Sequence, residues 1–248
     1  MSKAKIWDQW ADIHDLDNSV SLFETDADGV VRTERFGSGS SERDVLKRSV
    51  DMERLVVEQA EKVETDFHER GQRYEGVIYM MYWTDPEEGV IPLYIGKSGK
   101  FESRGYNLNP NLKHIRKRKS RFARWGYGTA FHLGSLSQTY FDSAWESSGE
   151  IPDNSKGRWI QTLFEPRSRQ LKQDVYLWMK AWEVDDIGPY TPDTGASPYL
   201  EELEHQLIAL AWELYPELLL NTEGLPYNPE AYARLRGWTD QSDLTDFE

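Results

Sequence analysis

The sequence contains no cysteine, which excludes disulfide bonds, thiolate catalysis and cysteine-ligated zinc. It also has no apolar run long enough to span a membrane, and residues 1–10 lack the charged-then-apolar pattern of a signal peptide. We therefore expect a cytoplasmic protein without a membrane partner. Hydrophobic residues make up 38% of the 248 residues, and 13 tyrosines and 10 tryptophans provide bulk for a core.

Positive charge is scarce, since 29 Lys and Arg residues stand against 43 Asp and Glu residues for a net charge of −14. These few cations are concentrated in one segment. Residues 97–124 hold ten of them and a single acid, a local net charge of +9, whereas the rest of the chain carries −23. Such segregation is typical of a protein with one surface for a polyanion.

The first 72 residues are predicted to form an extension with helical and hairpin elements. The pattern favours a helix at 5–13 and a hairpin whose strands, 19–25 and 30–36, flank a turn at 26–29. Ser41 and Asp44 resemble a variant capping box, and the apolar positions that follow predict one long amphipathic helix ending near Gly71.

Residues 73–224 change character and are predicted to form the main domain. Strands are expected at 74–83, 90–95 and 175–184, and helices at 110–125 and 197–215. Residues of about 134–172 are interpreted as an insertion, and residues 185–196 as a loop. Residues 225–248 form a polar C-terminal tail that the pattern does not place.

Two of the predicted strands carry similar short motifs with a tyrosine. Gly76-Val77-Ile78-Tyr79 lies on the first strand, and Tyr94-Ile95-Gly96-Lys97 ends the second. In paired strands both tyrosines can point to one face. For either tyrosine alone, coverage of a core is the better interpretation.

Three further residues gain meaning only in combination. Arg104 follows Tyr94 by ten residues, and a guanidinium matches the oxygens of a phosphate. Glu204 lies at the edge of the apolar stripe of the 197–215 helix, where a carboxylate is costly unless it pairs with a base or binds a metal. These two interpretations of Glu204 are equally good from the helix alone. Asn221, after three leucines, is by itself an ordinary turn or cap residue.

Together these residues resemble the GIY-YIG nuclease family. Residues 76–79 match its first motif with Val at the second position, and Tyr94-Ile95-Gly96 matches the second motif to the letter. Lys97, Arg104, Glu204 and Asn221 follow in the family's order, with apolar residues three and four positions after the glutamate. The resemblance covers residues 73–224, and it departs from the family in a long loop between the tyrosines and a large gap before Glu204.

The resemblance implies an α+β fold with a small three-stranded antiparallel sheet flanked by helices. It also implies hydrolysis of DNA phosphodiesters with Mg²⁺, or Mn²⁺ in its place, held by Glu204. Tyr79 or Tyr94 would be the general base if Lys97, Arg104 or the metal lowers its pKa. Arg104 would clamp the non-bridging oxygens, and Asn221 would orient the phosphate or lock the site. A restriction-type role is the most economical one for a chain of this length.

The basic helix predicted at 110–125 is the expected DNA contact. Its basic residues share one face, and Ile115 and Phe122 lie opposite. The expected DNA-binding residues are Lys113, His114, Arg116, Lys117, Arg121 and Arg124. A solvated helix face or a targeting signal is the alternative, and His114 is interpreted as a contact or packing residue.

Two other function classes stay open from the sequence. One is a catalytically idle DNA-binding or scaffold protein that keeps the fold, and metal-dependent cleavage distinguishes it from a nuclease. The other is a structural protein with chance motifs, which predicts that Tyr79, Tyr94, Arg104 and Glu204 are scattered in space. The sequence does not determine the recognition sequence or the cut pattern. It also leaves open whether the chain forms a homodimer.

Overall fold

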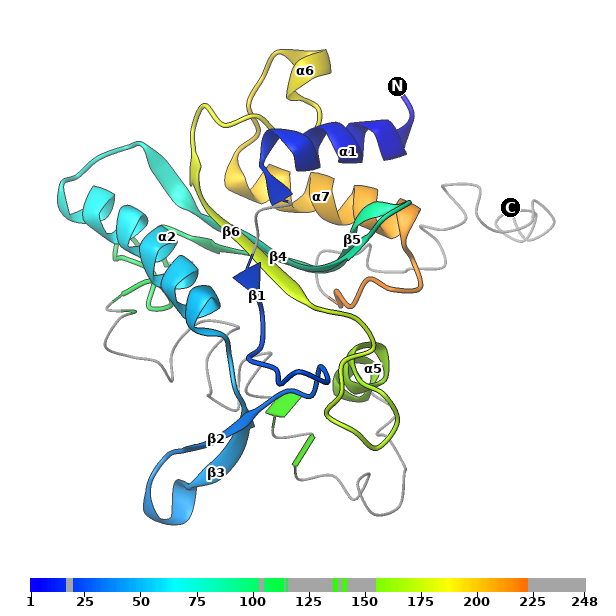
Figure 1. Ribbon diagram of the computed structural model, residues 1–248. Helices are drawn as coiled ribbons and strands as arrows, with labels where there is room; N and C mark the ends of the chain where they lie inside the picture. Colours follow the sequence, from blue (N-terminus) through cyan, green and yellow to red (C-terminus); the bar gives the residue numbers. More distant parts are fainter. Residues whose placement is uncertain are drawn as a thin grey trace, which may run out of the picture.

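A computed structural model gives the fold of the chain. It describes residues 1–16, 20–102, 105–113, 115, 136–137, 140–141 and 155–222. The fold is α+β, as expected, and its centre is a four-stranded antiparallel sheet (Figure 1). The strand order is β1 (Val20–Ser21), β6 (Tyr176–Glu183), β4 (Tyr74–Asp85) and β5 (Gly89–Gly99).

The three strands predicted between residues 74 and 184 all form, and β4 lies between the other two. The prediction of three strands nevertheless omits one, because the short β1 forms a fourth strand beside β6. Val20 pairs with Leu177, and the amide of Leu22 then donates to the carbonyl of Val175 at 2.8 Å. The N-terminal region thus supplies one edge of the sheet, and β5 forms the other.

Helices cover the two faces of this sheet (Figure 1). The helix α2 (Val50–His68) packs on one face, here called the α2 face, while α1 (Lys3–Ile13) and α7 (Leu200–Leu214) pack on the other, the α7 face. The side chains of β4 alternate between two cores: Tyr79 contributes to the α2-face core and Ile78 to the α7-face core. Residues 1–72 therefore pack into both cores.

The long helix of the N-terminal region begins later than predicted. Residues Arg43–Leu46 form β3, which pairs with β2 (Thr33–Phe36) in a separate two-stranded sheet, after the short 3₁₀ helix η2 (Gly39–Ser41). The prediction that Ser41 and Asp44 cap the helix is wrong. Ser49 is the cap, since its Oγ accepts a hydrogen bond from the amide of Met52 at 2.9 Å.

Two shorter helices complete the described fold. The helix α5 (Ser155–Leu163) lies within the predicted insertion, and its Trp159, Ile160 and Leu163 join the α2-face core. The four-residue helix α6 (Thr191–Thr194) forms within the predicted 185–196 loop. Most of the predicted 110–125 helix and the tail at 225–248 lie outside the described residues. None of the helices in the described ranges combines the length and apolarity that a membrane crossing requires.

Candidate functional site

The strand β5 is the centre of the candidate site, because both predicted motifs meet there. In the antiparallel β4–β5 hairpin, Tyr79 pairs with Gly96 and Ile78 pairs with Lys97. The hairpin turn is fixed locally: the Asp85 carboxylate accepts hydrogen bonds from the amides of Glu87 and Glu88 at 2.8 and 2.9 Å. The two motifs are therefore neighbours in space as well as in sequence order.

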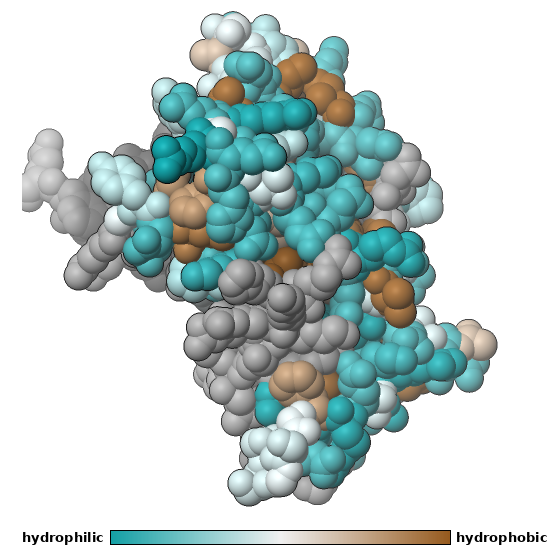
Figure 2. All heavy atoms as spheres, turned by 90° about the vertical axis from the view of Figure 1, so that its left-hand side faces the viewer, coloured by the Kyte–Doolittle hydropathy of each residue, from teal (hydrophilic) through white to brown (hydrophobic). Residues whose placement is uncertain are grey.

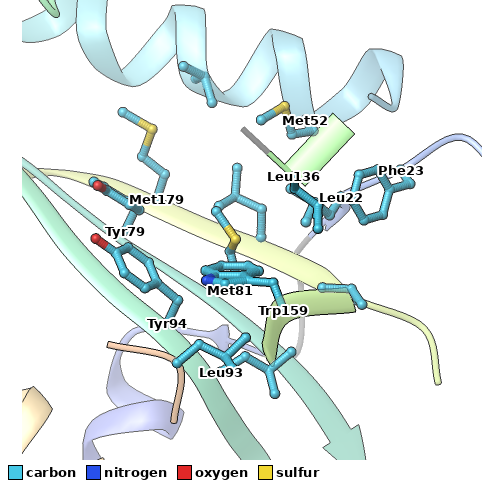
Figure 3. Close-up of a cluster of buried hydrophobic side chains, with 14 of the residues drawn as sticks. Leu22, Phe23, Met52, Tyr79, Met81, Leu93, Tyr94, Leu136, Trp159 and Met179 are labelled. Carbon is cyan, nitrogen blue, oxygen red and sulfur yellow. The ribbon is translucent and has the colours of Figure 1, made fainter. Parts of the chain in front are cut away.

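Tyr79 and Tyr94 lie side by side on the α2 face. Their ring centroids are 6.1 Å apart at an interplanar angle of 29°, and both hydroxyls point in the same direction (Figure 3). Tyr79 is fully buried and Tyr94 is 5% exposed. Trp159 of α5 packs against Tyr94, with its ring centroid 5.6 Å away. Both rings are thus part of the core, and their hydroxyls are held in a fixed position.

Gly96 is required by its contact with Tyr79. A Cβ atom added at residue 96 would lie 2.5 Å from Cζ of Tyr79, a distance that real side chains do not tolerate. The ring of Tyr79 therefore reaches across the sheet onto β5, and its hydroxyl lies over Gly96. This contact couples the tyrosine of the first motif to the glycine of the second.

We expect the Gly96→Ala variant to be destabilised by about 1–3 kcal/mol, because the buried Tyr79 ring must move to admit the new methyl group. Gly99→Ala on the same strand is the matched control, since a Cβ there meets only the carbonyl oxygen of Phe101 at 3.7 Å. Thermal unfolding measures both. Adding Tyr79→Leu should recover part of the loss, and equal stabilities of the two glycine variants would contradict the contact.

Glu204 and Lys97 form an ion pair on the α7 face, opposite to the tyrosines. The Lys97 ammonium lies 3.4 Å from a carboxylate oxygen of Glu204, and the side chains are 26% and 18% exposed. The basic partner that one interpretation of Glu204 required is therefore present. The carboxylate is also partly open to solvent, so the pair does not prevent its contact with a cation or a phosphate-bound metal.

Glu204 is the carboxylate of this site that could hold a hydrated cation. Within the described residues, no three His, Asp or Glu side chains lie close enough together to share one metal ion. Mg²⁺ is commonly held by one or two carboxylates together with substrate phosphate and water. Glu204 would supply the carboxylate, and the neighbouring Lys97 ammonium would bind the phosphate.

The side chain of Asn221 forms hydrogen bonds with the open edge of β5. Its side-chain oxygen accepts from the amide of Ile95 at 3.0 Å, and its side-chain nitrogen donates to the carbonyl of Ile95 at 2.8 Å. The amide of Leu220 donates to the carbonyl of Leu93 at 2.7 Å. The carboxamide therefore substitutes for a strand neighbour, and of the two roles considered for Asn221 this geometry favours locking the site.

Of the six predicted DNA-binding residues, only Lys113 lies within the described residues. Lys113 is exposed in a turn at the start of the predicted basic helix, and Asn109 connects this turn to β5 by donating to the carbonyl of Gly99 at 2.9 Å. The remaining basic candidates lie outside the described residues: Arg104, His114, Arg116, Lys117, Arg121 and Arg124.

A buried ion pair that was not predicted from the sequence fixes the end of β5. The Lys100 ammonium donates to the Asp66 carboxylate at 2.6 Å and to the carbonyl of Gly71 at 2.7 Å. Burial acts to raise the pKa of the Asp66 carboxyl, but the hydrogen bond from Lys100 and the amides of Tyr74 and Arg73 hold it below its usual value. The signal was available, since Asp66 follows Val63 by three residues on the apolar side of α2.

The described candidates thus meet at residues 94–97 of β5 but divide between the two faces of the sheet. The tyrosines lie on the α2 face, the Lys97–Glu204 pair lies on the α7 face, and Asn221 lies at the edge between them. The chain matches no family model, no curated protein and no solved structure, so any functional assignment depends on these residues and their geometry.

Proposed function

We propose that the chain is a metal-dependent endonuclease that hydrolyses phosphodiester bonds in DNA, with a site of the GIY-YIG type. The observation that supports this proposal is that three candidates, Tyr79 of β4, Glu204 of α7 and Asn221, lie next to residues 94–97 of β5, although Tyr79 and Glu204 lie on opposite faces of the sheet. The +9 segment that begins at Lys97 adds a second reason, because a concentration of positive charge directly after the site in the sequence favours a polyanion as the ligand.

The scissile phosphate would lie at the open edge of β5 beside Gly96 and Lys97. Ile95 and Gly99 both turn peptide groups toward this edge, where Asn221 and Asn109 bond to them. Strand alternation gives the peptide of Lys97 the same direction. The Lys97 side chain would approach a phosphate there from the α7 face, while the Tyr79 hydroxyl is buried over Gly96 on the other face.

The roles in hydrolysis follow from the chemistry of each group. A bound Mg²⁺ or Mn²⁺ would neutralise phosphate charge and acidify a coordinated water. Glu204 would hold that ion, while Lys97 and Arg104 would stabilise the charge that builds on the phosphoryl oxygens. Tyr79 or Tyr94 would take the proton of the attacking water as the bond to the leaving oxygen breaks. Asn221 would keep β5 in place.

The test of this function is cleavage of supercoiled plasmid DNA by the full chain. We expect nicked or linear products in Mg²⁺, none in EDTA, and recovery of cleavage when Mg²⁺ is restored. Binding without cleavage under all metal conditions would instead favour the idle DNA-binding protein. Neither binding nor cleavage would favour the structural protein.

The basic segment should carry the salt-dependent part of DNA binding. Changing Lys113, Lys117 and Arg121 together to Ser should flatten the slope of log affinity against log salt by about two to three units if all three contact phosphate. Sequence preference should change little, since phosphate contacts do not identify bases. Binding is measured without metal across a salt series.

The control for this variant removes three exposed cations elsewhere, Arg32, Arg35 and Arg54, which are 57%, 59% and 71% exposed. Both variants lose the same formal charge. An equal change of slope in the two would show that net charge, and not the basic segment, governs binding.

A further inference from the structure

A pocket of about 450 Å³ lies where the end of α2 meets the residues after β5. Its wall includes Phe67, His68, Arg70, Lys100, Phe101 and Tyr106. The volume falls within the range of roughly 300–1,000 Å³ that is usual for sites of small ligands. None of the residues assigned to the candidate nuclease site lines it.

The pocket presents aromatic surface to solvent. Tyr106 is 91% exposed and Phe101 is 46% exposed. The ring of Phe101 is braced by Phe67, whose centroid is 6.0 Å away at an interplanar angle of 65°. Figure 2 views the molecule from the α2 side, where hydrophilic residues predominate and hydrophobic ones are exposed only in small, separate groups. Braced, exposed rings in such a surface suit a flat ligand that stacks on them.

Arg70 is the cation of this pocket that is available to a ligand. Lys100 is buried and neutralised by Asp66, and His68 lies 3.8 Å from the Glu64 carboxylate. By contrast, Arg70 has no ion pair or side-chain hydrogen bond with any of the residues that the structure describes. One cation beside aromatic rings matches a ligand with one anionic group and one flat ring system.

The backbone of Arg70 points to the same conclusion. Its φ of 57° is in the left-handed region, and it occupies the position after the C-cap of α2, where glycine is usual. The amide of Gly71 closes the helix by donating to the carbonyl of Asp66 at 2.7 Å. The folded chain is therefore less stable with arginine at this position than it would be with glycine. Backbone strain of this kind is often found at functional sites.

We propose that this pocket binds an unpaired nucleobase of the DNA strand, stacked on Phe101 and Tyr106, with Arg70 on the adjoining phosphate. The inference rests on the proposed nuclease function, and it assigns a preference for DNA with an extrahelical base. Phe101 lies four residues beyond Lys97, roughly 13 Å along an extended chain. One DNA strand can therefore occupy both the pocket and the candidate site.

The test uses a short DNA duplex with one unpaired fluorescent adenine analogue, and the same duplex with an abasic residue at that position. Binding to the full chain is measured in EDTA, so that no cleavage occurs. We expect the analogue to be quenched on binding and the abasic duplex to bind at least about tenfold more weakly. Equal affinity for the two duplexes would overturn the proposal.

Two variants locate the effect in the pocket without loss of the fold. Arg70→Gly should leave thermal stability equal or higher, because it relieves the positive φ, yet weaken binding of the unpaired base about tenfold. Tyr106→Ala should reduce quenching. The matched controls are Arg54→Ala, at the other end of α2, and Tyr199→Ala, a tyrosine that is 72% exposed. Full base preference in the Tyr106→Ala variant, or wild-type affinity in the Arg70→Gly variant, would overturn the assignment.

Plasmid cleavage in Mg²⁺ by the same preparation separates this inference from the proposed function. Cleavage without any preference for an unpaired base would overturn the inference and leave the nuclease intact. Base-dependent binding without cleavage would support the pocket and contradict the proposed nuclease function.

Discussion

Replacing Glu204 by Gln is expected to reduce Mg²⁺-dependent DNA cleavage by about a hundredfold to ten-thousandfold. Loss of a carboxylate that holds the metal removes several kcal/mol of charge stabilisation, and each 1.4 kcal/mol corresponds to about a tenfold change in rate. The fold should survive, because both side chains of the pair with Lys97 keep some contact with solvent, at 26% and 18% exposure, so the loss of one charge costs less than in a fully buried pair. Single-turnover cleavage at saturating enzyme is the measurement.

The matched control is Glu201→Gln, an exposed carboxylate in the first turn of the same helix. It removes the same charge from α7 but should leave cleavage unchanged. The Lys97→Met variant then separates the two roles of Glu204. If Glu204 acts only as a partner for Lys97, both single variants and the double variant should cleave at similar rates. Wild-type cleavage rates in the Glu204→Gln variant at matched thermal stability would contradict the role of Glu204 as a metal ligand.

The second large effect is expected in stability, from the buried Lys100–Asp66 pair. Asp66→Asn should lower the free energy of unfolding by about 3–5 kcal/mol, because it leaves the Lys100 ammonium buried without a countercharge. For a chain of this size that corresponds to a fall in Tm of roughly 6–20 °C. The charge-removing control on the same helix is Glu58→Gln, whose pair with Lys62 is exposed and should contribute about 0–1 kcal/mol.

This stabilisation should also depend on pH with a defined sign. The pKa of the Asp66 carboxyl is lower in the folded chain than its ordinary value of 3.8. The stabilisation is therefore complete above that value and is lost as the pH falls through the folded pKa. The stability difference between the wild type and Asp66→Asn should be constant near neutral pH and narrow in acid. A difference that instead widens in acid would contradict the assignment of the pair.

The sequence by itself determined the local elements around the site. Aromatic and β-branched residues made β4, β5 and β6 predictable, and Asp85 with Gly89 made the hairpin turn predictable. The leucine stripe likewise placed α7 and put Glu204 at its edge. These features depend on periodicity and turn chemistry, which act between residues close in the chain.

Competition between two local signals was not resolved by the sequence. Ser41 and Ser49 are both reasonable helix caps, but Val45 and Leu46 gain more from burial in β3 against the rest of the molecule. The helix therefore begins after Ser49. The addition of β1 to the sheet has the same origin, because two residues carry too little pattern to predict a strand without the neighbour that they pair with.

Only the tertiary structure decided how the candidate residues are shared between the faces of the sheet. The register that pairs Tyr79 with Gly96 sends Lys97 to the α7 face, and a shift by one residue would send it to the tyrosines instead. Pairing of Lys97 with Glu204, and of Lys100 with Asp66, then follows from which helix covers which face. Residues far apart in the chain meet through packing, and a periodic pattern identifies a buried side without identifying what will cover it.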